Sequence, residues 1–112
     1  MNCGDVLLVP FPFTDTTGSK VRPALIISAD SFNRSEDRIF LPISSVYEKN
    51  NPHSYAIPKA HRAFAGSGLK QDSSVKWTKP TVLSTRIVQR RLGKIDALTL
   101  AEISAKIRSI FS

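Results

Sequence analysis

Two short apolar runs near the N-terminus, separated by a polar turn, constrain the fold of this chain more than any other feature. The runs are Val6–Val9 and Ala24–Ile27, and both are rich in leucine and β-branched residues. Runs of this length suit buried strands and are too short for helices. The segment between them includes Thr14–Lys20 (TDTTGSK), which is typical of a turn and holds a glycine for the reversal. The sequence therefore predicts a hairpin-like pair of strands.

Further short apolar segments follow at intervals along the chain. Arg38–Ile43 (RIFLPI) and Tyr55–Ile57 have strand-like composition, whereas Ser31–Asp37 and Glu48–His53 are polar and indicate loops or single turns. The later apolar or β-branched positions are Val75, Trp77, Val82, Ile87 and Val88. Several short strands separated by turns favour a small barrel or a strongly curved sheet. With 112 residues, we expect a single domain spanning residues 1–112.

The C-terminal segment has the pattern of an amphipathic helix. Thr99 and Glu102 form a T-x-x-E capping box, and Leu98 and Ile103 occupy the hydrophobic-staple positions around it. Apolar residues then recur at helical spacing at Leu100, Ile103, Ile107, Ile110 and Phe111. The pattern predicts a helix from about Leu100 to Ile110 with this face packed on the sheet.

The chain is strongly basic, which points to an anionic partner. It has 16 Lys and Arg against nine Asp and Glu, a formal charge of +7. Residues 59–94 carry only Asp72 as an acidic residue, against these basic ones: Lys59, Arg62, Lys70, Lys76, Lys79, Arg86, Arg90, Arg91 and Lys94. A basic face in this segment would attract phosphate polyanions, nucleic acid foremost. Charge alone leaves open the alternative of ordinary solubilising surface residues.

Several classes of site lack support in the sequence. A single cysteine, Cys3, excludes an internal disulfide and argues against cysteine-ligated zinc, and His53 and His61 lack metal-ligand spacing. Nucleotide-binding glycine loops and a G-x-S-x-G elbow are also missing. We find no signal peptide and no apolar stretch of membrane-spanning length. The expectation is a cytoplasmic protein with no metal, cofactor or membrane contact.

Arg22 stands where the second apolar run begins and is the main candidate for chemistry. RNA can be cleaved without metal when its 2′-hydroxyl attacks the adjacent phosphate, provided that the protein positions the chain and stabilises charge on the phosphate oxygens. An arginine fork suits that task, whereas a charge at a strand start is the simpler alternative. Ser44 and Ser45 follow another strand-like run and offer hydroxyl donors, although serines there often only close a turn.

Several blocks together resemble one known family. They are GDVLLVPFPFTD, GSKVRPALIIS, FLPISS, the region from Gly68–Leu69 to Val75, RLGKI and the capped C-terminal helix. In this order they resemble the MazF/PemK toxins of bacterial toxin–antitoxin systems over nearly the whole chain. The resemblance implies an SH3-like, strongly curved antiparallel barrel with a C-terminal helix, acting as a homodimer. It also implies a metal-independent, sequence-selective endoribonuclease that cuts single-stranded RNA, leaving a 2′,3′-cyclic phosphate and a 5′-hydroxyl. A cognate antitoxin with an acidic C-terminal segment would cover the RNA site.

The resemblance assigns roles to individual residues. Arg22 matches the family's catalytic arginine, and Ser44 matches a position where many members have threonine. In VKWTKPT, Lys76 falls on an arginine and Thr78 on an aspartate that serve as acid and base in some members, so the expected carboxylate is missing. Lys20 stands where some members have an acidic residue.

Three further positions near the expected site carry alternatives. Asp15 is a possible substitute base, with an ordinary turn aspartate as the simpler interpretation. Lys79 and Lys76 flank Trp77 and are expected to contact phosphates, which makes Lys20, Lys76, Thr78 and Lys79 the expected RNA-binding set. Trp77, or Phe13, could stack on a base, although burial in the core is the favoured interpretation for Trp77.

Two other functions remain open at this point. One is a non-enzymatic poison that binds DNA gyrase, as the structurally related CcdB toxins do. Those toxins need a tryptophan-containing C-terminal tail, whereas this chain ends in Ile110–Phe111–Ser112. The other is a catalytically weak, RNA-binding member of the same fold.

Overall fold

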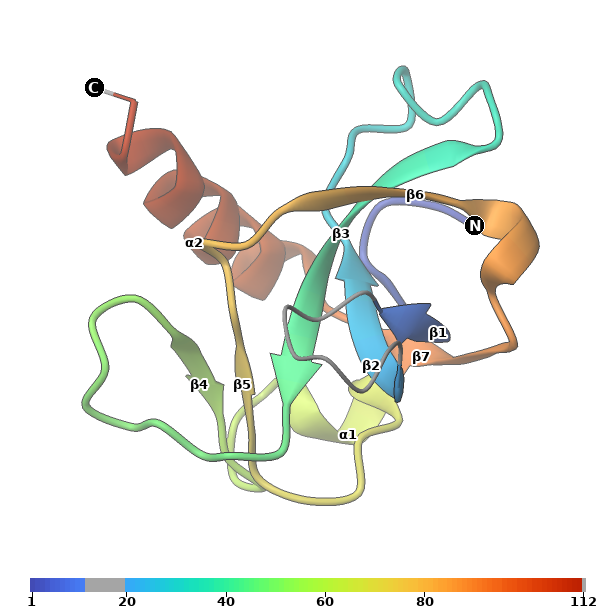
Figure 1. Cartoon of the computed structure of the whole chain (residues 1–112). Helices are drawn as coiled ribbons and strands as arrows, with labels where there is room; N and C mark the ends of the chain where they lie inside the picture. The colour runs from blue at the N-terminus through green and yellow to red at the C-terminus, as the bar shows by residue number, and fades with distance from the viewer. Residues whose placement is uncertain (12–19, 112) are drawn as a thin grey trace.

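The computed structural model describes residues 1–11 and 20–111, which form one strongly curved antiparallel sheet and two helices (Figure 1). Seven strands are present among these residues, in the order β4-β5-β3-β2-β1-β7, with β6 also paired to β3. The strands are β1 Asp5–Phe11, β2 Lys20–Ile26, β3 Asp37–Ser44, β4 Tyr55–Ile57, β5 Ser73–Val75, β6 Thr81–Ser84 and β7 Arg90–Lys94. The two helices are α1 Phe64–Ser67 and α2 Ala97–Ser109, and η1 Thr85–Ile87 is a single 3₁₀ turn. The expected curved antiparallel barrel with a C-terminal helix is confirmed.

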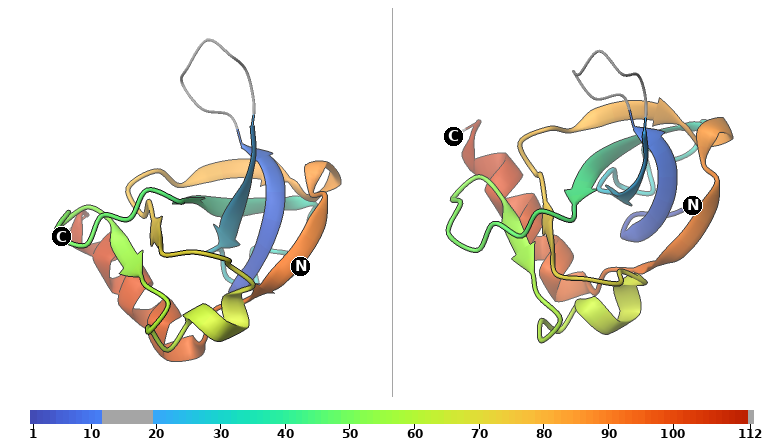
Figure 2. Two further views of the ribbon diagram at one scale, coloured as in Figure 1. Left: turned by 90° about the horizontal axis from the view of Figure 1, so that it is seen from below. Right: turned by 60° about the horizontal axis from the view of Figure 1, so that its bottom comes forward.

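The predicted hairpin-like pair is β1 and β2, which run antiparallel with Val9 opposite Arg22. Residues of both strands are buried on both faces of the sheet. Val6 and Leu25 belong to one core cluster, whereas Leu7 and Ile26 belong to a second. Two buried faces explain why the strands read as continuous apolar runs and not as alternating ones. Figure 2 shows how the sheet bends into the open barrel that this packing requires.

The third strand, β3, changes its neighbour halfway along. One edge pairs with β2, and the other pairs first with β6 and then, at Ile43 and Ser44, with β5. The chain between β5 and β6 therefore crosses beside the middle of β3. There it forms a turn, in which the backbone N–H of Lys76 donates to the carbonyl of Pro42 at 2.9 Å and that of Lys79 donates to Lys76 at 3.2 Å.

The C-terminal helix begins earlier than predicted. Its N-cap is Asp96, whose carboxylate accepts from the backbone N–H of Thr99 at 2.9 Å and from the Thr99 hydroxyl at 2.7 Å. The predicted capping box is therefore wrong, because an aspartate three residues upstream caps the helix at least as well as threonine. Glu102 lies in the second turn, and Leu98 is 60% exposed, so there is no hydrophobic staple at this site.

Only the first part of the predicted apolar face packs on the sheet. Ile103 is fully buried, and Leu100 and Ile107 are partly buried against the same core cluster. By contrast, Ile110 is 52% and Phe111 82% exposed, because the end of α2 extends beyond the sheet (Figure 1).

Several segments between the strands differ from their expected form. Trp77 lies in the turn after β5, Ile87 ends η1, and Val88 caps that turn, so none of the three is in a strand. The segment RLGKI was not predicted as a strand, and its first four residues belong to β7. Gly68 ends α1 with φ +76°, and a side chain there would collide with the carbonyl of Leu92. Only glycine therefore lets the chain pass so close to β7.

Candidate anion-binding site

Arg22 lies near the start of β2, at the point where this strand emerges from the core. It and Pro23 are half-buried, whereas the following Ala24–Ile26 are completely buried. Pro23 has no N–H to give to the sheet, which suits a position where pairing is giving way to a cavity. The Arg22 side chain lines two adjoining pockets.

The smaller pocket has a volume of about 170 Å³ and brings together four of the six predicted site residues. It is lined by Arg22, Pro42, Ile43, Ser44, Val46, Lys76 and Lys79. Three of these side chains are cationic, and they come from β2 and from the turn after β5. We call this cavity the anion pocket, because three positive charges around one small space favour a phosphate group.

Ser44 ends β3 at the wall of the anion pocket. Its Oγ accepts a hydrogen bond from the backbone N–H of Val46 at 3.0 Å. This contact uses the oxygen as an acceptor, so the hydroxyl proton can be donated to a phosphate oxygen.

Lys76 forms an ion pair with Glu48, a residue of the loop that follows β3. Burial and the nearby positive charge of Lys79 lower the pKa of Lys76 from its usual value. Lys79 itself is exposed and has no acidic partner among the residues that the structure describes. Lys76 is thus half-buried and paired with an acidic residue, whereas Lys79 is exposed and has no acidic partner among those residues.

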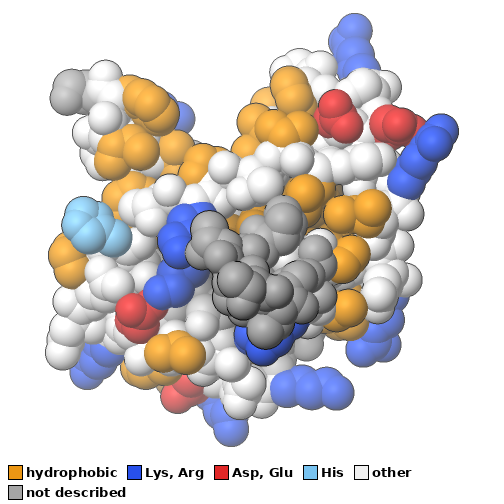
Figure 3. All heavy atoms as spheres, viewed as in Figure 1, with side chains coloured by type: hydrophobic (Ala, Val, Ile, Leu, Met, Phe, Trp, Pro, Cys, Tyr) orange, Lys and Arg blue, Asp and Glu red, His pale blue; other side chains and the backbone are white. Residues whose placement is uncertain are grey.

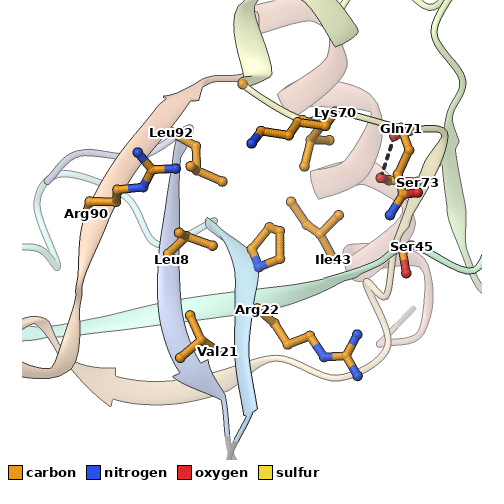
Figure 4. A pocket seen from close by; sticks show the side chains of 13 residues that line it. Leu8, Val21, Arg22, Ile43, Ser45, Lys70, Gln71, Ser73, Arg90 and Leu92 are labelled. Carbon is orange, nitrogen blue, oxygen red and sulfur yellow. Dashed lines mark hydrogen bonds between the residues drawn. The ribbon is translucent and has the colours of Figure 1, made fainter.

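The larger pocket, about 320 Å³, shares Arg22 and Ile43 with the anion pocket. Its apolar wall is formed by Leu8, Val21, Pro23, Ile43, Leu69 and Leu92. Arg22, Lys70 and Arg90 surround this wall, and Ser45, Gln71 and Ser73 add polar groups on one side (Figure 4). The Ser73 hydroxyl donates to the carbonyl of Gln71 at 2.8 Å, which fixes the loop before β5.

The remaining predicted residues lie outside both pockets. Lys20 is the exposed first residue of β2, opposite Phe11, and Thr78 is exposed in the turn after β5. Trp77 is 4% exposed within the core and contacts the His53 ring with centroids 6.1 Å apart, so its interpretation as a core residue is confirmed. Asp15 and Phe13 lie outside the described residues.

The expectations about a basic face, a metal site and a membrane span concern the described chain as a whole and not one pocket. On the face seen in Figure 3, basic side chains are scattered and do not form one continuous patch. Within residues 1–11 and 20–111, no three His, Cys, Asp or Glu side chains are grouped to hold a metal ion. In the same residues, no helix is long and apolar enough to cross a membrane.

Sequence reasoning missed Glu48 and Gln71, and it named Lys70 and Arg90 only as members of the basic segment 59–94, without placing them at the site. Glu48 is 28 residues from Lys76 in the chain, and the other three come from a loop and from a strand that was not predicted. Each has an ordinary polar context in the sequence. Only the tertiary fold brings Lys70, Gln71 and Arg90 to the pocket that Arg22 lines, and it brings Glu48 to Lys76. No local pattern could have placed these residues at the site.

A curved antiparallel half-barrel with a C-terminal helix, carrying an arginine and lysine pocket beside its central strand, has the fold of the MazF toxins. MazF from Deinococcus radiodurans is similar, with a TM-score of 0.75 and 24% identity over 99% of this chain and 96% of that one. Mycobacterium tuberculosis toxin MazF-mt6 gives a TM-score of 0.71 with 17% identity over 96% and 95%. A mycobacterial endoribonuclease in complex with its cognate antitoxin gives 0.70 with 17% identity over 99% and 92%.

The family follows from a separate match. The model of the PemK-like, MazF-like toxins of type II toxin–antitoxin systems matches residues 2–111. This chain therefore belongs to that family. Among curated protein sequences, none matches it.

Proposed function

We propose that this chain is the toxin of a type II toxin–antitoxin pair and acts as a metal-independent, sequence-selective endoribonuclease on single-stranded RNA. The observation that carries this proposal is the anion pocket, in which Arg22, Ser44, Lys76 and Lys79 surround a space suited to one phosphate. Family membership and the endoribonucleases among the structural neighbours support it.

The reaction is an internal transfer at phosphorus. The 2′-oxygen forms a bond to the adjacent phosphorus as its proton leaves, and the bond from phosphorus to the 5′-oxygen breaks as that oxygen gains a proton. The products are a 2′,3′-cyclic phosphate and a 5′-hydroxyl. Negative charge grows on the nonbridging oxygens, where the Arg22 fork and the Ser44 hydroxyl donate hydrogen bonds. Lys76 and Lys79 add positive charge to the same pocket.

The larger pocket extends the same site along the bound RNA strand. Its apolar wall suits a base next to the scissile phosphate, and Lys70 and Arg90 suit the phosphates on either side. Lys20 and Thr78 would contact more distant parts of the RNA. Lysine contacts of this kind add salt-dependent affinity and little sequence choice.

The proposal includes the partners of a toxin. A cognate antitoxin with an acidic C-terminal segment would occupy the same cations as RNA and so block the site. The mycobacterial endoribonuclease was solved with its cognate antitoxin, and the Deinococcus radiodurans MazF with MazE. We include a homodimer and a cytoplasmic location in the proposal.

Incubation of the purified protein with a long single-stranded RNA in EDTA tests the proposal. We expect cuts at a defined sequence, and mapping of the ends should give the cyclic phosphate and the 5′-hydroxyl. Arg22→Ala should lower the rate by at least about 10²-fold, since it removes the main donor to the phosphate, without changing the melting temperature markedly. Arg34→Ala, in an exposed loop, is the matched control.

Other outcomes would identify other functions. Tight RNA binding without any cleavage would indicate a binding member of the fold, and gyrase-dependent DNA breaks would indicate a gyrase poison. Full activity in Arg22→Ala would remove this arginine from the mechanism.

A further inference from the structure

An acidic residue lies beside the anion pocket, where it was not expected. The carboxylate of Glu48 contacts the ammonium of Lys76, and these two side chains are only 26% and 25% exposed. A negative charge next to a phosphate site opposes phosphate binding, unless it improves the position of a cation that the phosphate needs. The contact therefore calls for a functional explanation.

The carboxylate of Glu48 is fixed by its own loop. Its two oxygens accept from Asn51 Nδ2 at 3.0 Å and from Ser54 Oγ at 3.2 Å. The backbone N–H of Glu48 donates to the hydroxyl of Ser74, which is completely buried in β5, at 2.8 Å. Contacts on both sides of the residue hold the carboxylate in one place, so it can act as an anchor.

Lys76 is fixed at its backbone as well, through its N–H bond to Pro42 on the pocket wall. A lysine side chain has four rotatable bonds, and in water its charge would spread over many positions. Glu48 removes much of this freedom at the outer end of the side chain. Lys79, exposed in the same pocket, has no such anchor among the described residues.

We propose that Glu48 is a positioning residue for RNA cleavage: its carboxylate holds the Lys76 ammonium at the anion pocket, so that the cation meets the scissile phosphate held by Arg22 and Ser44. This inference rests on the proposed endoribonuclease activity. It gives Glu48 an indirect role through Lys76 and leaves proton removal from the 2′-hydroxyl to another group.

Single-turnover cleavage of a short RNA in EDTA by the full chain tests this role. Glu48→Gln keeps the size of the side chain and removes the charge that holds Lys76, so we expect a rate about ten- to a hundredfold lower. Glu48→Asp keeps the charge and should recover part of the loss. The matched control is Glu36→Gln, which breaks an exposed ion pair with Arg86 at the far end of β3 and should leave the rate unchanged.

A double-mutant cycle separates positioning from a merely structural effect. Lys76→Met should lower the rate about a hundredfold, since it removes a cation from the phosphate site. In that background Glu48→Gln should cause no further loss, because there is no ammonium left to position. An equal additional loss would show that Glu48 acts without Lys76 and would overturn the inference.

The remaining outcomes also decide the matter. Cleavage by the wild type with an unchanged Glu48→Gln rate refutes this inference alone, whereas no cleavage by the wild type refutes both it and the proposed function. Should Glu48→Gln fail to fold by its melting curve, Glu48→Asp provides the test, alone and combined with Lys76→Met. The shorter carboxylate holds Lys76 less closely, so Glu48→Asp alone should lower the rate and should cause no further loss beside Lys76→Met. A Glu48→Asp or Lys76→Met variant as fast as the wild type overturns the inference.

Discussion

The salt dependence of RNA binding measures how the two lysines of the anion pocket meet the phosphate backbone. For a single strand, each neutralised phosphate contributes about −0.7 to the slope of log K against log salt. Lys79 is exposed, with no acidic partner among the described residues, and brings a full charge to RNA. Lys76 is already paired with Glu48, so its contact with RNA displaces fewer counterions. We therefore expect Lys79→Ala to reduce the slope by about 0.7, and Lys76→Ala to reduce it by clearly less.

Fluorescence anisotropy of a labelled RNA gives the slope. The RNA carries 2′-deoxynucleotides, which lack the attacking 2′-hydroxyl, so it is bound and not cleaved. Binding would be titrated at several salt concentrations for the wild type, Lys76→Ala, Lys79→Ala and a control. Lys106→Ala is a suitable control, because Lys106 lies in the last turn of α2 and lines neither pocket. Equal changes in Lys79→Ala and Lys106→Ala, or a larger change in Lys76→Ala than in Lys79→Ala, would refute this account of the pocket.

Three further predictions concern stability and use denaturant or thermal unfolding. Asp96→Ala should lower the free energy of unfolding by about 1–2 kcal/mol, since Asp96 is the N-cap, and Thr99→Val should lower it by less. A larger loss in Thr99→Val than in Asp96→Ala would show that Thr99 is the capping residue. Burial, and then the hydrogen bond to Glu102, raise the pKa of Tyr55 to about 12 from 10.0. Stability that is present below pH 10 should therefore fall as the pH rises toward 12, and Tyr55→Phe should remove this fall; an identical pH profile in the variant would contradict the assignment. Gly68→Ala should cost at least about 1 kcal/mol, because its φ is positive and Leu92 leaves no room, whereas Ala65→Gly in α1 is a control for changes at an exposed helical position.

The central strands could be predicted because they are buried on both faces. Val6–Val9 is apolar along its whole length and Arg38–Ile43 is apolar after its first residue, and few alternatives exist for apolar segments so short. The strand Arg90–Lys94 escaped prediction because it is mostly exposed and basic, so its pairing with β1 leaves no apolar pattern. A strand whose one apolar side chain is Leu92 offers no hydrophobic periodicity to detect.

The start of the C-terminal helix shows a second reason why prediction from the sequence failed. Asp96 and Thr99 both have the side chain of a good N-cap, and the choice between them depends on how Ile95 enters the core, which is a tertiary matter. The site residues likewise divide into those that local sequence identifies and those that only the fold brings together. Arg22 and Ser44 could be proposed from the blocks around them, whereas Glu48 and Lys76 are far apart in the sequence and meet through the pairing of β3 with β5.

The place where β3 changes partners also bears on how such a protein can diverge. Lys76 and Lys79 lie in the turn between β5 and β6, outside the pairing of either strand with β3. The exposed side chains of this turn, Thr78 and Lys79, can be exchanged without removing a pair from the sheet, whereas Trp77 packs in the core and is needed for the fold. Arg22 and Ser44, by contrast, belong to paired strands. Changes in ligand binding at little cost to stability are therefore confined to the exposed positions of this gap in the sheet.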